Sequence, residues 1–200
     1  RAGIQIAGDM ANQQHTAMNT TTKKAAPKTP KSTPKNTQSE FEKFFVEQLQ
    51  DIYWAEKHLS KGLKKMQMAA TSPRLAEAFK KHYTDSEKQM STLEQLFELM
   101  GEKPKGKRCE AMAGLVTEAE EMISDTEANS FVRDAGLILA AQKAEHYEIA
   151  TYGTLKALAV YLPQKRVHKL LDTLLRDEKR TDQLLTALAE EFVNESAAVE

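Results

Sequence analysis

Apolar residues recur at alternating steps of three and four over most of the chain beyond Phe41. This spacing is the repeat of an amphipathic α-helix whose apolar face packs against other helices. No stretch shows the alternation of apolar and polar residues that a half-buried β-strand requires. The sequence therefore predicts an all-α fold.

The apolar pattern divides into four long helices and one short one. Ser72 and Pro73 are a helix cap followed by a proline in the first turn, so a helix begins there, and Gly101 ends it. The apolar seams run over Phe45–Met66, Leu75–Met100, about 110–124, about 128–161 and Val167–Phe192.

The connections between these segments predict how the helices are paired. The turns at 71–73 and 162–164 are short, so each joins two antiparallel neighbours. The segment at 101–127 is long enough to cross from one hairpin to the other, and it carries the short helix. We therefore predict a four-helix bundle domain over 40–195, with an additional short fifth helix in the crossover.

Residues 1–39 have a different composition from the rest of the chain. They are rich in Lys, Thr, Ser and Pro, have little to bury, and are predicted to be a disordered tail. Their net charge is about +5, which leaves about −6 on residues 40–200. We interpret the tail as a solubilising leader, and a nucleic-acid-binding arm is the alternative. The basic residues concerned are Lys23, Lys24, Lys28, Lys31 and Lys35.

Overall composition restricts the other classes of function. The formal net charge of −1 gives no general bias toward nucleic acid or membrane surfaces. No apolar run approaches the roughly 20 residues of a membrane span. Cys109 is the only cysteine, which excludes an internal disulfide framework and fits a reducing compartment. We therefore expect a cytoplasmic protein without membrane partners.

Polar residues occupy the middle of all four predicted apolar seams. They are Glu56, Gln89, Glu145 and Glu178, and each lies about 15 to 18 residues from its hairpin turn. With a rise of about 1.5 Å per residue, the four side chains reach nearly the same height in the bundle. A carboxylate on an apolar stripe needs a partner, because burying an unpaired charge costs several kcal/mol.

Two of the helices carry a second oxygen-bearing residue four positions from the first. Asp85 stands four residues before Gln89, and Asp182 stands four residues after Glu178. Positions i and i+4 lie on one helix face, so the sequence predicts six candidate metal ligands around one axis. They are Glu56, Asp85, Gln89, Glu145, Glu178 and Asp182. Two divalent cations would supply +4 against five carboxylates.

Oxygen ligands favour hard or borderline metals, so Fe or Mn is predicted and Zn is an alternative. Glu148 is either a further bridging ligand or points aside. Tyr152 is either a hydrogen-bond donor to a ligand carboxylate or a core tyrosine. The nearby histidines are interpreted as hydrogen-bond partners rather than ligands, namely His58, His82 and His146.

Simpler structural explanations exist for the same polar residues. A single polar group in a bundle core often fixes only the register of the helices. Lysines could also neutralise some of the carboxylates, with Lys57, Lys88, Lys143 and Lys179 as candidates. The convergence of several carboxylates in one layer favours metal, because like charges at close range repel each other.

Several segments resemble the YciF/YciE family of ferritin-like bacterial proteins. They are DIYWAEKHL, SPRLAEAFKKHYTDSEKQ, CEAMAGLVTEAEE, DAGLILAAQKAEHYEIATYGTL and LLRDEKRTDQLLTALA, which together cover nearly all of 41–192. The resemblance implies a ferritin-like bundle with a fifth helix, a dinuclear metal centre, a homodimer and an association with stress responses. The metal-site positions of the family fall on the six candidate ligands. Asp85 departs from the family, which usually has the longer glutamate there.

The function implied is a stress-associated protein with a di-iron or di-manganese centre and a redox role toward oxygen or peroxide. The chain lacks the Glu-x-x-His pairs of ferritin-like oxidases, and this counts against oxygen-activating chemistry. The main alternative is a non-enzymatic helical interaction protein with little or no metal. A DNA-protecting cage rests on the basic tail alone and would require a large oligomer.

Overall fold

The computed structural model describes residues 38–200. The predicted tail over 1–39 lies almost entirely outside the described residues, and so does its interpretation as a leader or nucleic-acid arm. Residues 38–200 form helices and no strand, which confirms the all-α prediction. No helix in this part of the chain combines the length and apolar character needed to cross a membrane.

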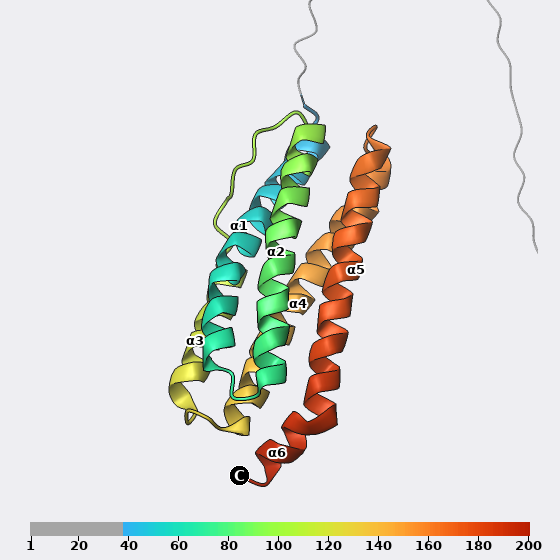
Figure 1. The fold of residues 1–200 in the computed structure, drawn as a ribbon. Helices are drawn as coiled ribbons and strands as arrows, with labels where there is room; N and C mark the ends of the chain where they lie inside the picture. The colour runs from blue at the N-terminus through green and yellow to red at the C-terminus, as the bar shows by residue number, and fades with distance from the viewer. Residues whose placement is uncertain (1–37) are drawn as a thin grey trace, which may run out of the picture. The chain divides into compact units, whose positions relative to one another are not determined.

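Four long helices form the bundle as two antiparallel hairpins (Figure 1). The first hairpin pairs α1 (Glu40–Ala69) with α2 (Pro73–Leu99), and the second pairs α4 (Phe131–Leu158) with α5 (Lys165–Leu188). The crossover carries α3 (Glu110–Asp125), which packs on α1 and α4. This is the predicted ferritin-like four-helix bundle with a short additional helix.

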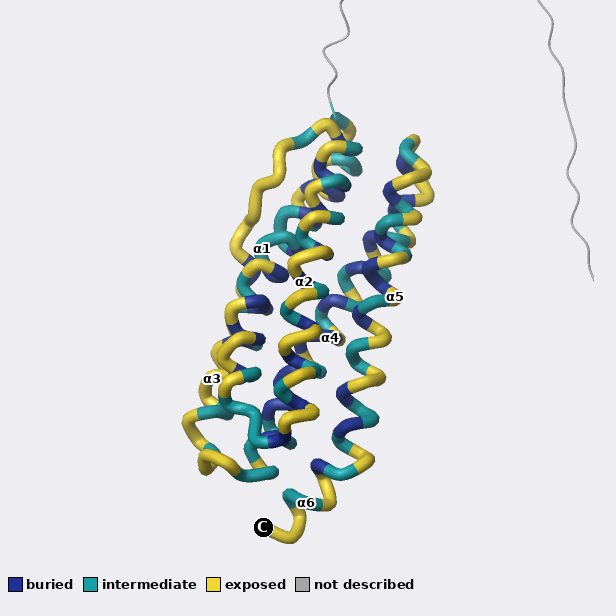
Figure 2. Tube along the Cα trace, in the orientation of Figure 1, coloured by how far each residue is buried: buried dark blue, intermediate teal, exposed yellow. Residues whose placement is uncertain are grey.

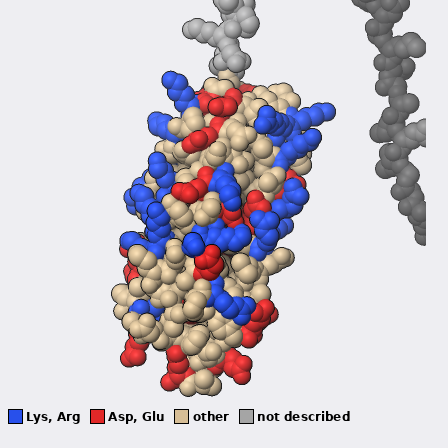
Figure 3. Space-filling view, in the orientation of Figure 1, with Lys and Arg blue, Asp and Glu red and all other residues tan. Residues whose placement is uncertain are grey.

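Shorter helical segments follow α4 and α5. A single 3₁₀ turn (Ala159–Tyr161) extends α4 before Pro163, and a π turn (Ala189–Val193) links α5 to α6 (Asn194–Ala198). The buried residues of the long helices face one another along the bundle axis, and exposed residues cover its outside (Figure 2). The face seen in Figure 3 intersperses basic with acidic side chains, so it presents no continuous basic surface.

Local interactions explain where the first two helices begin. Ser39 Oγ accepts from Glu42 N at 3.1 Å and Glu42 Oε2 accepts from Ser39 N at 2.8 Å, a reciprocal cap. At the turn between α1 and α2, the buried Asp134 of α4 accepts from Thr71 N at 2.6 Å and from Ser72 N at 2.7 Å. The second hairpin therefore holds the turn of the first.

The start of α4 differs from the prediction. The sequence pattern places it at about residue 128, whereas the helix begins at Phe131. Asn129 has φ +63°, in the left-handed region, and Ser130 Oγ accepts from Arg133 N at 3.1 Å. The serine cap, which apolar periodicity does not detect, therefore sets the boundary.

The crossover is fixed to α1 before α3 begins. Gly101 has φ +74° at the end of α2, and Lys107 N donates to Gln50 O at 3.0 Å. Cys109, buried at the start of α3, lies 3.0 Å from the Tyr147 hydroxyl, which donates to Asp51 Oδ2 at 2.5 Å. This hydrogen-bond chain joins α1, α3 and α4 and gives the single cysteine a structural role.

Candidate metal centre

Four glutamates are completely buried in the middle of the bundle. Glu56 comes from α1, Glu145 and Glu148 from α4, and Glu178 from α5, and none has measurable solvent exposure. They occupy the apolar seams of their helices, so the packing of the flanking leucines carries them inward. Four carboxylates at the centre of a small core require compensation of their charge.

A histidine joins three of these carboxylates. Potential ligand atoms of His82, Glu145, Glu148 and Glu178 all lie within 4.8 Å of one another. The group combines α2, α4 and α5, so both hairpins contribute to it. The His82 Nδ1 atom is 3.2 Å from Glu145 Oε1, but the two atoms are not aligned as donor and acceptor.

Glu56 is held beside this group by two hydroxyl donors. Ser86 Oγ donates to Glu56 Oε2 at 2.6 Å, and the Tyr152 hydroxyl donates to Glu56 Oε1 at 2.6 Å. Hydrogen bonds of this kind fix the orientation of a carboxylate that binds metal. Of the two alternatives considered for Tyr152, the structure shows the donor to a core carboxylate.

Gln89 performs a similar role for the glutamate of α5. Its Nε2 atom donates to Glu178 Oε1, while its own Oε1 atom has no hydrogen-bond partner. The amide oxygen is therefore an additional neutral donor atom at the edge of the carboxylate group.

The buried atoms without hydrogen-bond partners are concentrated at this cluster. Within residues 38–200, every such side-chain atom except Gln164 Oε1 belongs to one of five residues in the bundle centre. Buried polar atoms are nearly always satisfied in folded proteins, so a concentration of exceptions indicates a missing ligand. The five residues are His82, Gln89, Glu145, Glu148 and Glu178.

Burial dominates the acid–base behaviour of the carboxyl groups. It raises the pKa of Glu56 to about 7, although hydrogen bonds from Ser86 and Tyr152 act in the opposite direction. Burial also raises the pKa of Glu145, Glu148 and Glu178 well above the usual value, and repulsion from neighbouring carboxylates contributes. Without a cation, the cluster therefore retains protons at neutral pH.

The pKa of the buried histidine shifts in the opposite direction, because burial disfavours the charged form of every ionisable group. Burial lowers the pKa of His82 to about 4, so its imidazole is neutral at physiological pH. A neutral imidazole offers a lone pair to a metal but supplies no charge to balance the glutamates. His82 therefore does not act as the cationic partner of Glu145.

The donor set fits two divalent cations. Four glutamates carry −4 when ionised, and two divalent ions supply +4, while His82 and Gln89 contribute neutral donor atoms. Carboxylate and imidazole donors suit Fe and Mn, and they also accept Zn. The residues that would hold such ions are Glu56, Glu145, Glu148 and Glu178, with His82 and Gln89 beside them.

The structure brings together four of the six ligands predicted from sequence, namely Glu56, Gln89, Glu145 and Glu178. Asp85 is not part of the cluster. Its carboxylate instead pairs with Lys81 at 2.5 Å and with Lys88 at 2.8 Å. Asp182 lies at the margin of the cluster, where its carboxylate accepts a hydrogen bond from Gln142 Nε2 at 3.0 Å.

Two residues of the cluster were absent from the predicted ligand set. For Glu148 the sequence leaves a bridging ligand and an outward-pointing side chain as alternatives, and its position three residues after Glu145 is the signal for the first. The sequence pattern favours His82 as a hydrogen-bond partner of a ligand, whereas in the structure both of its ring nitrogens lack hydrogen bonds. The other histidines lie elsewhere: His58 stacks on Trp54, and the exposed His146 is 3.4 Å from Asp182.

Comparisons with known proteins agree with this architecture. Residues 40–198 match the family described as "Domain of unknown function (DUF892)". Protein YciF of Escherichia coli K12 is 45% identical over 157 residues, which are 78% of this chain and 94% of that protein. The crystal structure of the E. coli stress protein YciF matches with a TM-score of 0.74 and 44% identity, over 78% of this chain and 99% of that one.

Two further solved structures share the fold. YcfI of Rhodopseudomonas palustris, described as a candidate structural protein, has a TM-score of 0.71 and 37% identity, over 76% of this chain and 96% of its own. A protein of Xanthomonas campestris has a TM-score of 0.63 at 20% identity, over 77% of this chain and 94% of its own. The second likeness concerns the fold alone.

Proposed function

This chain belongs to the DUF892 family of YciF-like proteins, and on that premise we propose that it is a stress-associated, ferritin-like protein with a dinuclear Fe or Mn centre. The concentration of unpartnered buried donor atoms at His82, Glu145, Glu148 and Glu178 is the observation that carries the proposal. The association with stress is transferred from the E. coli relative, which is named a stress protein.

The chemistry proposed for the centre is electron transfer to oxygen or peroxide, which Fe or Mn supplies when bound. The protein contributes a buried group of carboxyl side chains in which Ser86 and Tyr152 hold Glu56 in one orientation. His82 keeps its lone pair available because burial disfavours its protonation. Water is excluded by the apolar seams above and below the carboxylates.

Metal content after reconstitution tests this proposal. Protein reconstituted anaerobically with Fe(II) or Mn(II) and then desalted is expected to retain up to two ions per chain in elemental analysis. Glu148→Gln should lose metal because it removes a converging carboxylate, whereas Asp182→Asn should retain it because that side chain lies at the margin. Retention by Glu148→Gln together with loss by Asp182→Asn would instead favour the ligand set predicted from sequence.

A non-enzymatic structural role is the second candidate function. The similarity to YcfI of R. palustris favours it, since that protein is described as a candidate structural protein. It predicts no stoichiometric Fe, Mn or Zn in the same elemental analysis. Absorption spectra recorded before and after exposure to oxygen then separate a redox centre from a site that only binds metal.

We also propose a cytoplasmic homodimer, as the family resemblance implies. Exposed apolar side chains are available for such an interface, including Phe44, Leu139 and Tyr161. Sedimentation equilibrium should give about twice the chain mass of 22.4 kDa. A monomer at micromolar concentration, or a large cage, would contradict the expected dimer.

A further inference from the structure

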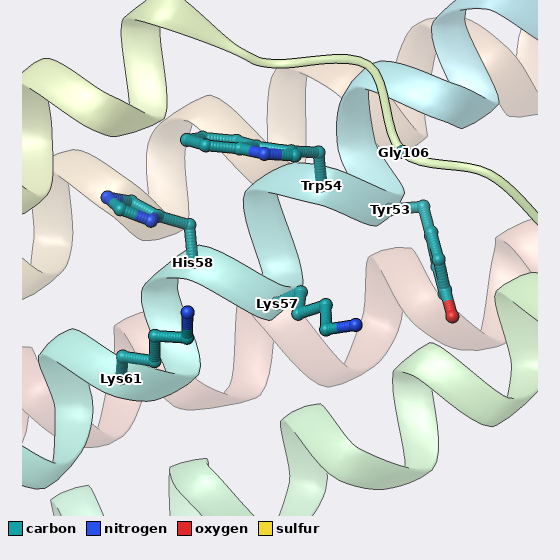
Figure 4. Close-up of a pocket in the computed structure, with 6 residues that line it drawn as sticks. All are labelled: Tyr53, Trp54, Lys57, His58, Lys61 and Gly106. Carbon is teal, nitrogen blue, oxygen red and sulfur yellow. The ribbon is translucent and has the colours of Figure 1, made fainter.

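A second polar site lies on the outer face of α1, away from the buried carboxylates. It is a pocket of about 340 Å³ between this helix and the crossover loop (Figure 4). Glu56 points into the bundle, whereas the neighbouring Lys57 is exposed on the pocket side. The residues that line it are Tyr53, Trp54, Lys57, His58, Lys61 and Gly106.

Aromatic rings form one wall of this pocket. The rings of Trp54 and His58 are stacked, with centroids 4.5 Å apart and an interplanar angle of 17° (Figure 4). Tyr53 is fixed on the other side, because its hydroxyl donates to Glu94 Oε1 at 2.8 Å and its ring packs edge-on against Phe97. Arg108 also lies over the indole, with its Cζ atom 5.7 Å from the centroid of the Trp54 ring. The wall therefore consists of planar rings and one guanidinium group that are already positioned.

The crossover loop closes the pocket with a glycine. A Cβ atom added to Gly106 would lie 3.1 Å from Trp54 Cβ, so a side chain there would push against the indole. The backbone hydrogen bond from Lys107 N to Gln50 O holds the loop against α1 at this level. The absence of a side chain at residue 106 thus allows the loop to approach the aromatic wall.

Two lysines without carboxylate partners supply the charge. Lys57 and Lys61 are one helical turn apart on the exposed face of α1. Among the described residues, no acidic group lies within salt-bridge distance of either amine. The surrounding basic residues differ, because Lys65, Lys107 and Arg108 are paired with Glu120, Glu47 and Glu110 respectively.

We propose that this pocket binds a small phosphate-bearing ligand with a planar ring, of the mononucleotide class. The phosphate contacts the amines of Lys57 and Lys61, and the ring lies against the aromatic wall made by Trp54, His58 and Tyr53. Bases stack favourably on aromatic side chains, and charge-assisted hydrogen bonds to phosphate are stronger than neutral ones. The volume is at the lower end of the range for ligand pockets, which suits one nucleotide.

The single tryptophan makes the proposal directly testable. Trp54 is the only tryptophan of the chain, so a ligand that enters this pocket should change the intrinsic fluorescence. AMP, adenosine and inorganic phosphate are titrated separately into the full chain at low salt with a chelator present. The chelator prevents phosphate from binding through metal, so the result is independent of the proposed metal centre. AMP should give a saturable change, and adenosine and phosphate should each bind at least about tenfold more weakly.

Matched lysine variants show whether AMP binds in this pocket. Lys57→Gln/Lys61→Gln should weaken AMP binding on the order of tenfold or more, because two charge-assisted contacts are lost. Lys165→Gln/Lys169→Gln removes two exposed lysines with the same spacing on α5 and should leave the affinity unchanged. Equal losses in both double variants would show non-specific attraction and overturn the proposal. Calorimetry that detects no AMP binding to wild type, or affinities for phosphate and AMP that do not differ, would also overturn it.

Discussion

Glu145→Leu is expected to abolish metal binding and to leave the metal-free protein more stable than metal-free wild type. Glu145 is completely buried, and neither of its oxygens has a hydrogen-bond partner. Replacing it by leucine removes a desolvated, repelled carboxyl group and leaves no donor stranded. Substitutions of buried charges by hydrophobes of similar size are neutral or stabilising by about 1–4 kcal/mol, so we expect a gain of about 1–3 kcal/mol.

Comparison with Glu178→Leu sharpens this expectation. Gln89 Nε2 donates to Glu178, so leucine at residue 178 strands a buried amide donor. An unsatisfied buried donor costs about 1–3 kcal/mol, which offsets most of the gain. Both variants should lose metal, but only Glu145→Leu should be clearly stabilised. Glu98→Leu, an exposed position on α2, serves as a control and should change stability by less than about 0.5 kcal/mol.

Urea unfolding in the presence of a chelator measures these differences. If Glu145 were instead the partner of a buried cation, its removal would strand that charge and cost about 3–5 kcal/mol. The neighbouring group is His82, and burial lowers its pKa to about 4, which makes a cationic partner unfavourable at neutral pH. Loss of stability of that size, with no response of wild type to added metal, would contradict the dinuclear centre.

The fold could be predicted from the sequence because one repeating pattern, the spacing of apolar residues, specifies every long helix of the bundle. Apolar spacing of three and four identifies each long helix, and the turns near Pro73 and Pro163 interrupt it clearly. Helix boundaries were harder to predict where a hydrogen bond from a single side chain determines the first residue of the helix. Ser130 begins α4 later than the apolar pattern indicates, and the π turn at Ala189–Val193 has no signature in apolar spacing.

The candidate site was predictable only where its residues lie on a seam. Glu56, Gln89, Glu145 and Glu178 take the place of apolar residues, and the structure buries all four. The pairing at i and i+4 was a weaker signal, because it selected Asp85, which lies one position beside the seam formed by His82, Ser86 and Gln89. Asp182 likewise lies one position beyond Thr181, which belongs to the seam of α5.

The role of His82 could not be obtained from the sequence, because it depends on which neighbours fill the core around it. Its position between Phe79 and Ser86 predicts burial. Burial alone does not tell whether an imidazole finds a donor or acceptor. The structure surrounds His82 with carboxylates that are not aligned to hydrogen-bond with it, and this packing makes it a candidate ligand.

Metal is expected to remove the pH dependence of stability that the buried glutamates cause. In the metal-free protein, burial raises the pKa of Glu56 to about 7, and the pKa values of Glu145, Glu148 and Glu178 are also raised above 4.5. The native state therefore binds more protons than the unfolded state once the pH exceeds about 4.5. Stability must fall as pH rises through this interval, and Glu56 alone accounts for about 3 kcal/mol by pH 7.

His82 acts in the opposite direction over part of the same range. Its pKa is lowered from 6.5 to about 4, so it adds stability as pH rises from 4 to 6.5. One imidazole cannot outweigh four carboxyl groups, and above pH 6.5 its contribution is constant. The decline of metal-free stability should therefore be steepest above about pH 6.5, where the raised carboxyl groups are no longer opposed by His82.

Metal removes the fall of stability with pH because it binds only the ionised carboxylates. Its affinity rises as the protons leave, and binding to the folded state alone adds about 4 kcal/mol when free metal is about 1,000 times its Kd. Urea unfolding at a series of pH values should give a falling curve with chelator above pH 6.5. With excess Mn(II) the curve should be nearly flat, because neither the metal-bound native state nor the unfolded state then holds carboxyl protons. Glu145→Leu should show a shallower fall without metal and no response to Mn(II). Parallel curves for wild type in the two conditions would mean that the buried glutamates do not exchange their protons for metal.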